Sequence, residues 1–160
     1  MEEVTAFHEA GHAFVAVMAG ARVVSVTIEP DEDERYGDTE VAWSRSQFSD
    51  REFAEKLALV ALAGPVTEMV MTGDRYHPAL LPEWSADWAQ AMNAASALFS
   101  DEAKQVEFLE RMTIETHSIL SRDDVWSFIG AIVDELVAHE TLEGETVHEI
   151  VDQWMRLHSS

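Results

Sequence analysis

The chain has 160 residues, which fits a single domain spanning residues 1–160, and its formal net charge is −21. A surface this acidic repels phosphate backbones, so we expect no nucleic-acid partner. The sequence has no cysteine, so any metal must be held by His, Asp or Glu. Apolar stretches are too short for a membrane helix and the first residues are acidic, so we expect a cytoplasmic protein without membrane insertion.

The first part of the chain predicts a helix followed by two strands. Apolar residues at helical spacing predict a helix over about Val4–Ala19, with Thr5 as its cap and Gly20 as its stop. Runs rich in β-branched residues then predict strands at Arg22–Glu29 and Asp38–Trp43, joined by an acidic turn. The two strands are expected to form a small hairpin or the edge of a sheet.

The remainder predicts helices separated by one long loop. Ser49 and Glu52 have the spacing of a capping box and open a helix that runs to about Met71. Gly and Pro residues predict a loop over Thr72–Glu83. Further helices are expected at Trp84–Phe99, at Asp101–Leu120, at Arg122–Ala138 with Ser121 as its cap, and at Glu145–Leu157. The predicted fold class is therefore mainly α, with a small β-hairpin or sheet after the first helix.

A His-Glu-x-x-His motif lies inside the first predicted helix. His8 and His12 are four residues apart, so both imidazoles lie on one helical face and can bind one zinc ion. Glu9 falls beside that position, where its carboxylate can take a proton from a metal-bound water. The alternative is an amphipathic helix whose two histidines are ordinary core or surface groups.

Four segments in chain order resemble the peptidase domain of the FtsH family, the membrane-anchored ATP-dependent zinc proteases of peptidase family M41. The resemblance covers nearly the whole chain and is strongest at the His-Glu-x-x-His helix. The matching segments are Thr5-Ala6-Phe7-His8-Glu9-Ala10-Gly11-His12-Ala13, Val26-Thr27-Ile28-Glu29-Pro30, Ala63-Gly64-Pro65-Val66-Thr67-Glu68 and His139-Glu140-Thr141-Leu142-Glu143-Gly144-Glu145.

The resemblance implies a helical zinc metalloendopeptidase and a ligand set. In that family an Asp on a later helix is the third zinc ligand, and Asp87 is the matching position beside His8 and His12, with Glu9 activating water. Three protein ligands leave one position open, as a catalytic zinc requires. The loop before Asp87 departs from the family's Gly/Ser-rich pattern, which places the substrate cleft in question.

Two other residues compete for the third ligand position. Glu68 is a rival, because a Glu on a later helix serves in other zinc peptidases, and the resemblance favours Asp87 over it. His77 could also reach the site from its loop, but a loop His beside a Pro is more often exposed. Glu68 is instead expected beside the site, as an acceptor for a His N–H.

Two functions remain open at this stage. The chain contains no phosphate-loop motif, so the first is a zinc metallopeptidase that lacks its own unfoldase and cleaves peptides or unfolded proteins. The second is a non-enzymatic, zinc-stabilised module that binds a protein partner. An intact Glu9 favours the peptidase, because a structural metal site needs no general base. A homo-oligomer or an association with a partner ATPase is compatible with both.

Overall fold

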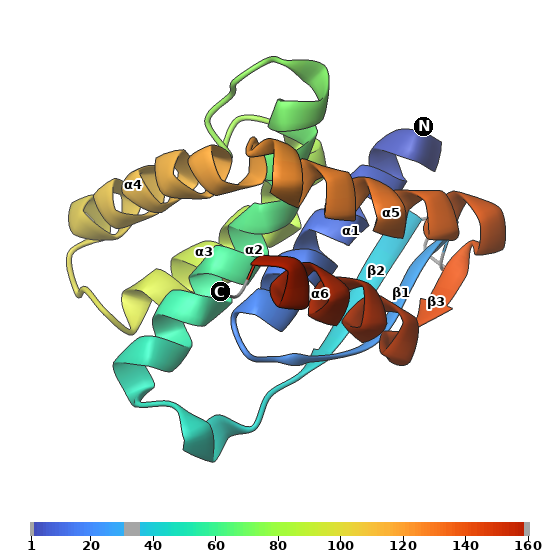
Figure 1. Ribbon diagram of the computed structural model, residues 1–160. Helices are drawn as coiled ribbons and strands as arrows, with labels where there is room; N and C mark the ends of the chain where they lie inside the picture. The colour runs from blue at the N-terminus through green and yellow to red at the C-terminus, as the bar shows by residue number, and fades with distance from the viewer. Residues whose placement is uncertain (1, 31–35, 159–160) are drawn as a thin grey trace.

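A computed structural model describes residues 2–30 and 36–158 (Figure 1). The helices are α1 (Glu2–Met18), α2 (Asp50–Thr72), α3 (Ser85–Ser96), α4 (Glu102–Leu120), α5 (Asp123–His139) and α6 (Gly144–His158), with short 3-10 turns at Arg45–Gln47 and Pro82–Trp84. The strands are β1 (Arg22–Pro30), β2 (Tyr36–Ala42) and β3 (Thr141–Glu143). The predicted mainly α fold with a small sheet after the first helix is confirmed. The predicted acidic turn falls on residues 31–35 and lies outside the described residues.

The three strands form one antiparallel sheet in the order β2-β1-β3. β1 is central, with Val26 opposite Thr39 of β2 on one side and Leu142 of β3 on the other. The third strand was not predicted from the sequence, because three residues are too few for an alternating pattern. Its pairing brings the end of α5 and the start of α6 back to the first hairpin (Figure 1).

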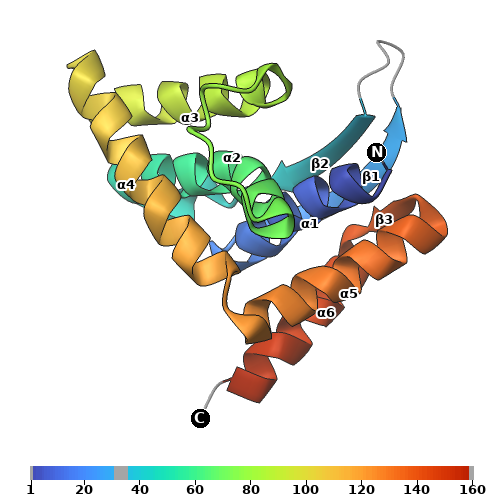
Figure 2. The same ribbon diagram turned by 90° about the horizontal axis from the view of Figure 1, so that it is seen from above.

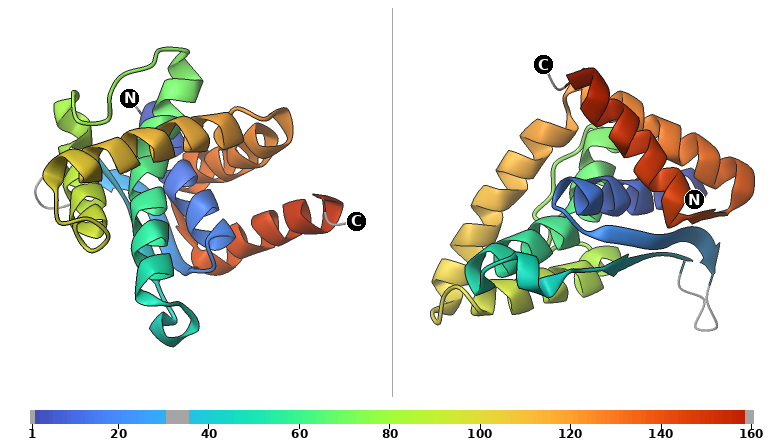
Figure 3. Two further views of the ribbon diagram at one scale, coloured as in Figure 1. Left: turned by 90° about the vertical axis from the view of Figure 1, so that its left-hand side faces the viewer. Right: turned by 60° about the horizontal axis from the view of Figure 1, so that its bottom comes forward.

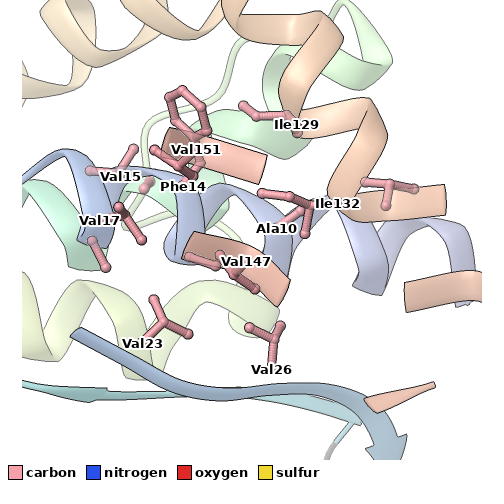
Figure 4. Packing of buried hydrophobic residues seen from close by; sticks show 14 of the residues in the cluster. Ala10, Phe14, Val15, Val17, Val23, Val26, Ile129, Ile132, Val147 and Val151 are labelled. Atoms are coloured by element: carbon pink, nitrogen blue, oxygen red, sulfur yellow. The ribbon is translucent and has the colours of Figure 1, made fainter. Parts of the chain in front are cut away.

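The main core surrounds α1, which packs against α2, the sheet, α5 and α6 (Figure 2). Figure 4 shows Val23 and Val26 of β1 facing Val147 of α6, with Ala10 and Phe14 of α1 above them. A smaller cluster joins α2, α3 and α4, which lie together on the opposite side of α1 from α6 (Figure 3). α1 is therefore held on several sides, which fixes the direction in which its polar side chains point.

Helix ends were predicted with mixed success. The capping box at Ser49 and Glu52 is confirmed, with both of its reciprocal hydrogen bonds present. Thr5 is not a cap, because α1 begins at Glu2, where acidic residues in the first turn suit the helix dipole. Ser121 is not the cap of α5 either, since it ends α4, and Arg122 occupies the N-cap position of α5.

Candidate metal centre

Three side chains from two helices converge on one point. His8 and His12 lie one turn apart on α1, with their Nε2 atoms 3.2 Å apart. Asp87 in the first turn of α3 faces both, with Oδ2 at 2.8 Å from His8 Nε2 and Oδ1 at 3.3 Å from His12 Nε2. One ligand atom from each residue lies within 4.8 Å of the others, as a metal ion would require. The structure thus brings together the three residues that the sequence nominated as metal ligands.

Outer hydrogen bonds determine which imidazole nitrogens are free. His12 Nδ1 lies 2.7 Å from the carbonyl oxygen of Val60, which can only accept, so this nitrogen donates. His8 Nδ1 lies 2.6 Å from Glu68 Oε2 and donates to that carboxylate. In the neutral imidazoles both Nε2 atoms then carry lone pairs, which is the tautomer that a metal ligand needs.

This donor set fits a zinc ion. Two lone pairs and a carboxylate oxygen that face one another repel unless a proton or a metal ion lies between them. Two nitrogens bound at about 2.0–2.1 Å in a tetrahedron would lie roughly 3.3–3.4 Å apart, close to the 3.2 Å between the two Nε2 atoms. Two His and one carboxylate, each His with an outer acceptor, are typical of catalytic zinc sites that keep one position open.

The carboxylates beside His8 and His12 favour a positive charge at this point of the structure. Burial lowers the pKa of His8, but its hydrogen bonds to Asp87 and Glu68, together with the charges of Glu9 and Asp87, raise that pKa to about 10. Burial raises the pKa of Asp87, but the charges and hydrogen bonds of His12 and His8 hold it well below its usual value. A proton and a metal ion therefore compete for the same Nε2 atoms.

The close crossing of α1 and α2 depends on two glycines. A Cβ on Gly64 of α2 would overlap Nε2 of both His12 and His8. A Cβ on Gly11 of α1 would overlap the side chain of Thr67 and approach the carbonyl oxygen of Ala63. The absence of side chains at these positions lets α2 pass beside the imidazoles, with Glu68 aimed at His8.

Glu9 lies on the neighbouring face of α1 and points toward β2. Its side chain is buried, with the residue 6% exposed, and Thr39 Oγ1 lies 2.8 Å from Glu9 Oε1. Burial raises the pKa of this carboxyl, against the opposing charges of His12 and His8. The general base nominated from the sequence is therefore next to the converging ligands but held by a separate element, the strand β2.

The competing ligand candidates occupy other positions. Glu68 accepts from Nδ1 of His8, and Trp84, which is 2% exposed, donates its indole N–H to the same oxygen of Glu68 at 2.8 Å. His77 lies apart from the metal group: its Nε2 is 3.1 Å from Glu110 Oε2, and its ring packs against Trp88. Glu68 thus supports a ligand, and His77 connects its loop to α4.

Sequence reasoning missed the residues that shape the centre without binding in it. Thr39, Trp84 and the carbonyl of Val60 come from a strand, a loop end and a helix backbone, and no motif marks any of them. Gly64 lies inside one of the four segments that resemble the FtsH family, so the sequence did point to this position. The contact of Gly64 with the imidazoles could not be predicted from the sequence, because that contact depends on how α2 crosses α1.

Comparison with known families supports a peptidase. The family model for M50B-like peptidases matches residues 3–72, a segment that includes His8, Glu9, His12 and Glu68 and ends before Asp87. No curated protein matches the chain. The match supports a metallopeptidase-type domain and is not specific to the FtsH family, so that narrower resemblance rests on the motifs alone. Within the described residues, no helix is both long and apolar enough to cross a membrane.

Proposed function

We propose that the protein is a zinc-dependent metallopeptidase in which His8, His12 and Asp87 bind the metal and Glu9 is the general base. The observation that carries this proposal is the convergence of two Nε2 lone pairs and one carboxylate, each imidazole fixed from behind by an acceptor on α2. The match to M50B-like peptidases over residues 3–72, which include His8, Glu9 and His12, supports the same chemical class.

Bound zinc would polarise the substrate carbonyl and lower the pKa of a coordinated water. Glu9 would take a proton from the attacking water as the oxygen of that water bonds to the carbonyl carbon, and would later deliver the proton to the departing amine nitrogen. The protons balance, because Glu9 is ionised again at the end of each cycle. Burial suits Glu9 to this task, because burial raises the pKa of the carboxyl and so makes it a stronger proton acceptor.

We propose flexible peptides or unfolded proteins as the substrates of this site. The binding-module alternative uses the same metal ligands but gives no role to Glu9. Detecting cleavage is therefore the discriminating test between the two functions.

The experiment compares protein purified without chelator, protein stripped of metal, and stripped protein given zinc. We expect about one zinc per chain by elemental analysis and cleavage of casein that is lost on stripping and restored by zinc. Zinc should also raise the melting temperature, because a ligand that binds only the folded state stabilises it. Absence of zinc binding would overturn the metal site, and zinc binding without cleavage would overturn the peptidase in favour of the binding module.

A further inference from the structure

A strand residue outside the zinc motif makes direct contact with the proposed base. Thr39 lies on β2 opposite Val26 of β1, so the sheet fixes its backbone. Its hydroxyl lies 2.8 Å from Glu9 Oε1 and 3.2 Å from the main-chain carbonyl oxygen of Glu9. Both of these groups can only accept from a hydroxyl when Glu9 is ionised, so Thr39 is the donor.

The two oxygens of Glu9 have different surroundings. Oε1 receives the hydroxyl of Thr39, whereas Oε2 lies over Gly37, where a Cβ would come within 2.7 Å of it. Gly37 has a φ of 89°, which an L side chain rarely adopts, so the strand presents bare backbone to Oε2. The strand therefore holds Oε1 by a hydrogen bond from Thr39, while Oε2 lies against the backbone of Gly37 with no side chain between them.

We propose that Thr39 is the positioning residue of the general base: its hydroxyl fixes Glu9 through Oε1 and leaves Oε2 as the oxygen that accepts the proton of water. This inference rests on the proposed function. In the step, an O–H bond of water breaks and an Oε2–H bond forms, while Thr39 keeps its own proton. A carboxylate fixed before the reaction loses less rotational freedom in the transition state.

The first test uses three single variants in the zinc-loaded protein. Thr39→Val keeps the shape but removes the donor, Thr39→Ser keeps the donor, and Thr27→Val is the matched control, a hydroxyl lost from β1 on the side that faces β3. We expect Thr39→Val to lower kcat by about 10–100-fold, the range typical of groups that orient a reacting residue, with little change in KM. Thr39→Ser should retain most activity, and zinc content should be unchanged in all three.

A second readout does not depend on turnover. A peptide hydroxamate binds zinc and places its own proton against the general base, so its Kd, measured by calorimetry, reports the position of Glu9. Thr39→Val should weaken binding about tenfold in the wild-type background and have no effect in the Glu9→Gln background, because the two changes act through one group. Equal weakening in both backgrounds would show a purely structural role and overturn the proposal.

The outcomes separate the two claims. If the wild-type protein cleaves casein and Thr39→Val has the same kcat and the same hydroxamate Kd, the role of Thr39 is overturned. The proposed peptidase function then stands. A wild-type protein that neither binds zinc nor cleaves casein overturns the proposed function and this inference together. Loss of activity in Thr39→Val, with rescue in Thr39→Ser and zinc retained, supports both.

Discussion

Gly64 and His12 lie so close together that a methyl group on Gly64 would overlap Nε2 of the imidazole. The backbone of α2 thus forms one wall of the proposed metal centre, and the same helix supplies the acceptors that fix the imidazoles, the Val60 carbonyl and the Glu68 carboxylate. The position of α2 relative to α1 therefore determines both the shape of the centre and the tautomers of its histidines.

Gly64→Ala should remove zinc binding while the protein remains folded, because the added methyl displaces the ends of two side chains rather than backbone. Zinc content after dialysis against a limiting zinc buffer measures the effect. Gly130→Ala on α5 is the matched control, since a Cβ there meets nothing within 4 Å and a helical Gly-to-Ala change is favourable by about 1 kcal/mol. Full zinc occupancy in Gly64→Ala would show that α2 is not the wall described.

Gly11→Ala should destabilise the fold instead of acting on the metal alone. The methyl group would overlap the Cβ and Oγ1 of Thr67, whose hydroxyl already donates to the carbonyl oxygen of Ala63, so the two helices must separate. Overpacking of this kind costs about 1–3 kcal/mol, which urea unfolding would detect as a lower midpoint. An unchanged midpoint would contradict the close packing of α1 on α2.

The sequence predicted the helices well because their signals are local. Apolar spacing, the capping box at Ser49 and the Gly and Pro residues of the long loop each act within a few residues. Two helix caps were misplaced by a few residues, at Thr5 and Ser121, and one strand was missed because a distant contact decides it. β3 is a strand only because β1 is there to pair with it, and Thr141–Glu143 carries no strand pattern of its own.

The residues of the candidate site also differ in whether a local pattern or a distant contact defines them. His8, Glu9 and His12 are set by spacing on one helix, so the sequence alone nominated them. Asp87 needed the family resemblance, because nothing local relates α3 to α1 across 79 positions of separation. Thr39 and Trp84 were missed, since a hydroxyl or an indole at an ordinary strand or turn position has no motif.

Asp87→Ala should lower zinc affinity far more than Glu68→Ala does. Asp87 faces the Nε2 atoms of both histidines, whereas Glu68 meets His8 at Nδ1, the ring nitrogen that faces away from the proposed metal position. Loss of an outer partner costs about 10–100-fold in affinity, and loss of a ligand removes a metal bond outright. Competition with a fluorescent chelator measures both affinities, and Glu68→Gln, which keeps an acceptor, is the control. The reverse order would make Glu68 the ligand.

Trp84→Phe should weaken zinc binding less than Glu68→Ala. The indole N–H donates to the oxygen of Glu68 that also accepts from His8, so its removal loosens Glu68 without deleting the acceptor. Loss of this hydrogen bond and of buried volume should lower the free energy of unfolding by about 1–3 kcal/mol. Urea unfolding and zinc competition test the two effects, with Trp88→Phe on α3 as the control. If Trp84→Phe loses as much zinc affinity as Glu68→Ala, the indole rather than the carboxylate is the main support of His8.

The comparison of Glu9→Gln with the wild-type protein tests the central claim most directly. Both proteins are loaded with zinc, their metal content is verified, and casein cleavage is measured under identical conditions. We predict equal zinc content and a loss of cleavage of at least about 100-fold in Glu9→Gln, because an amide cannot accept the proton of water. Equal cleavage by the two zinc-loaded proteins would contradict the role of Glu9 as the general base.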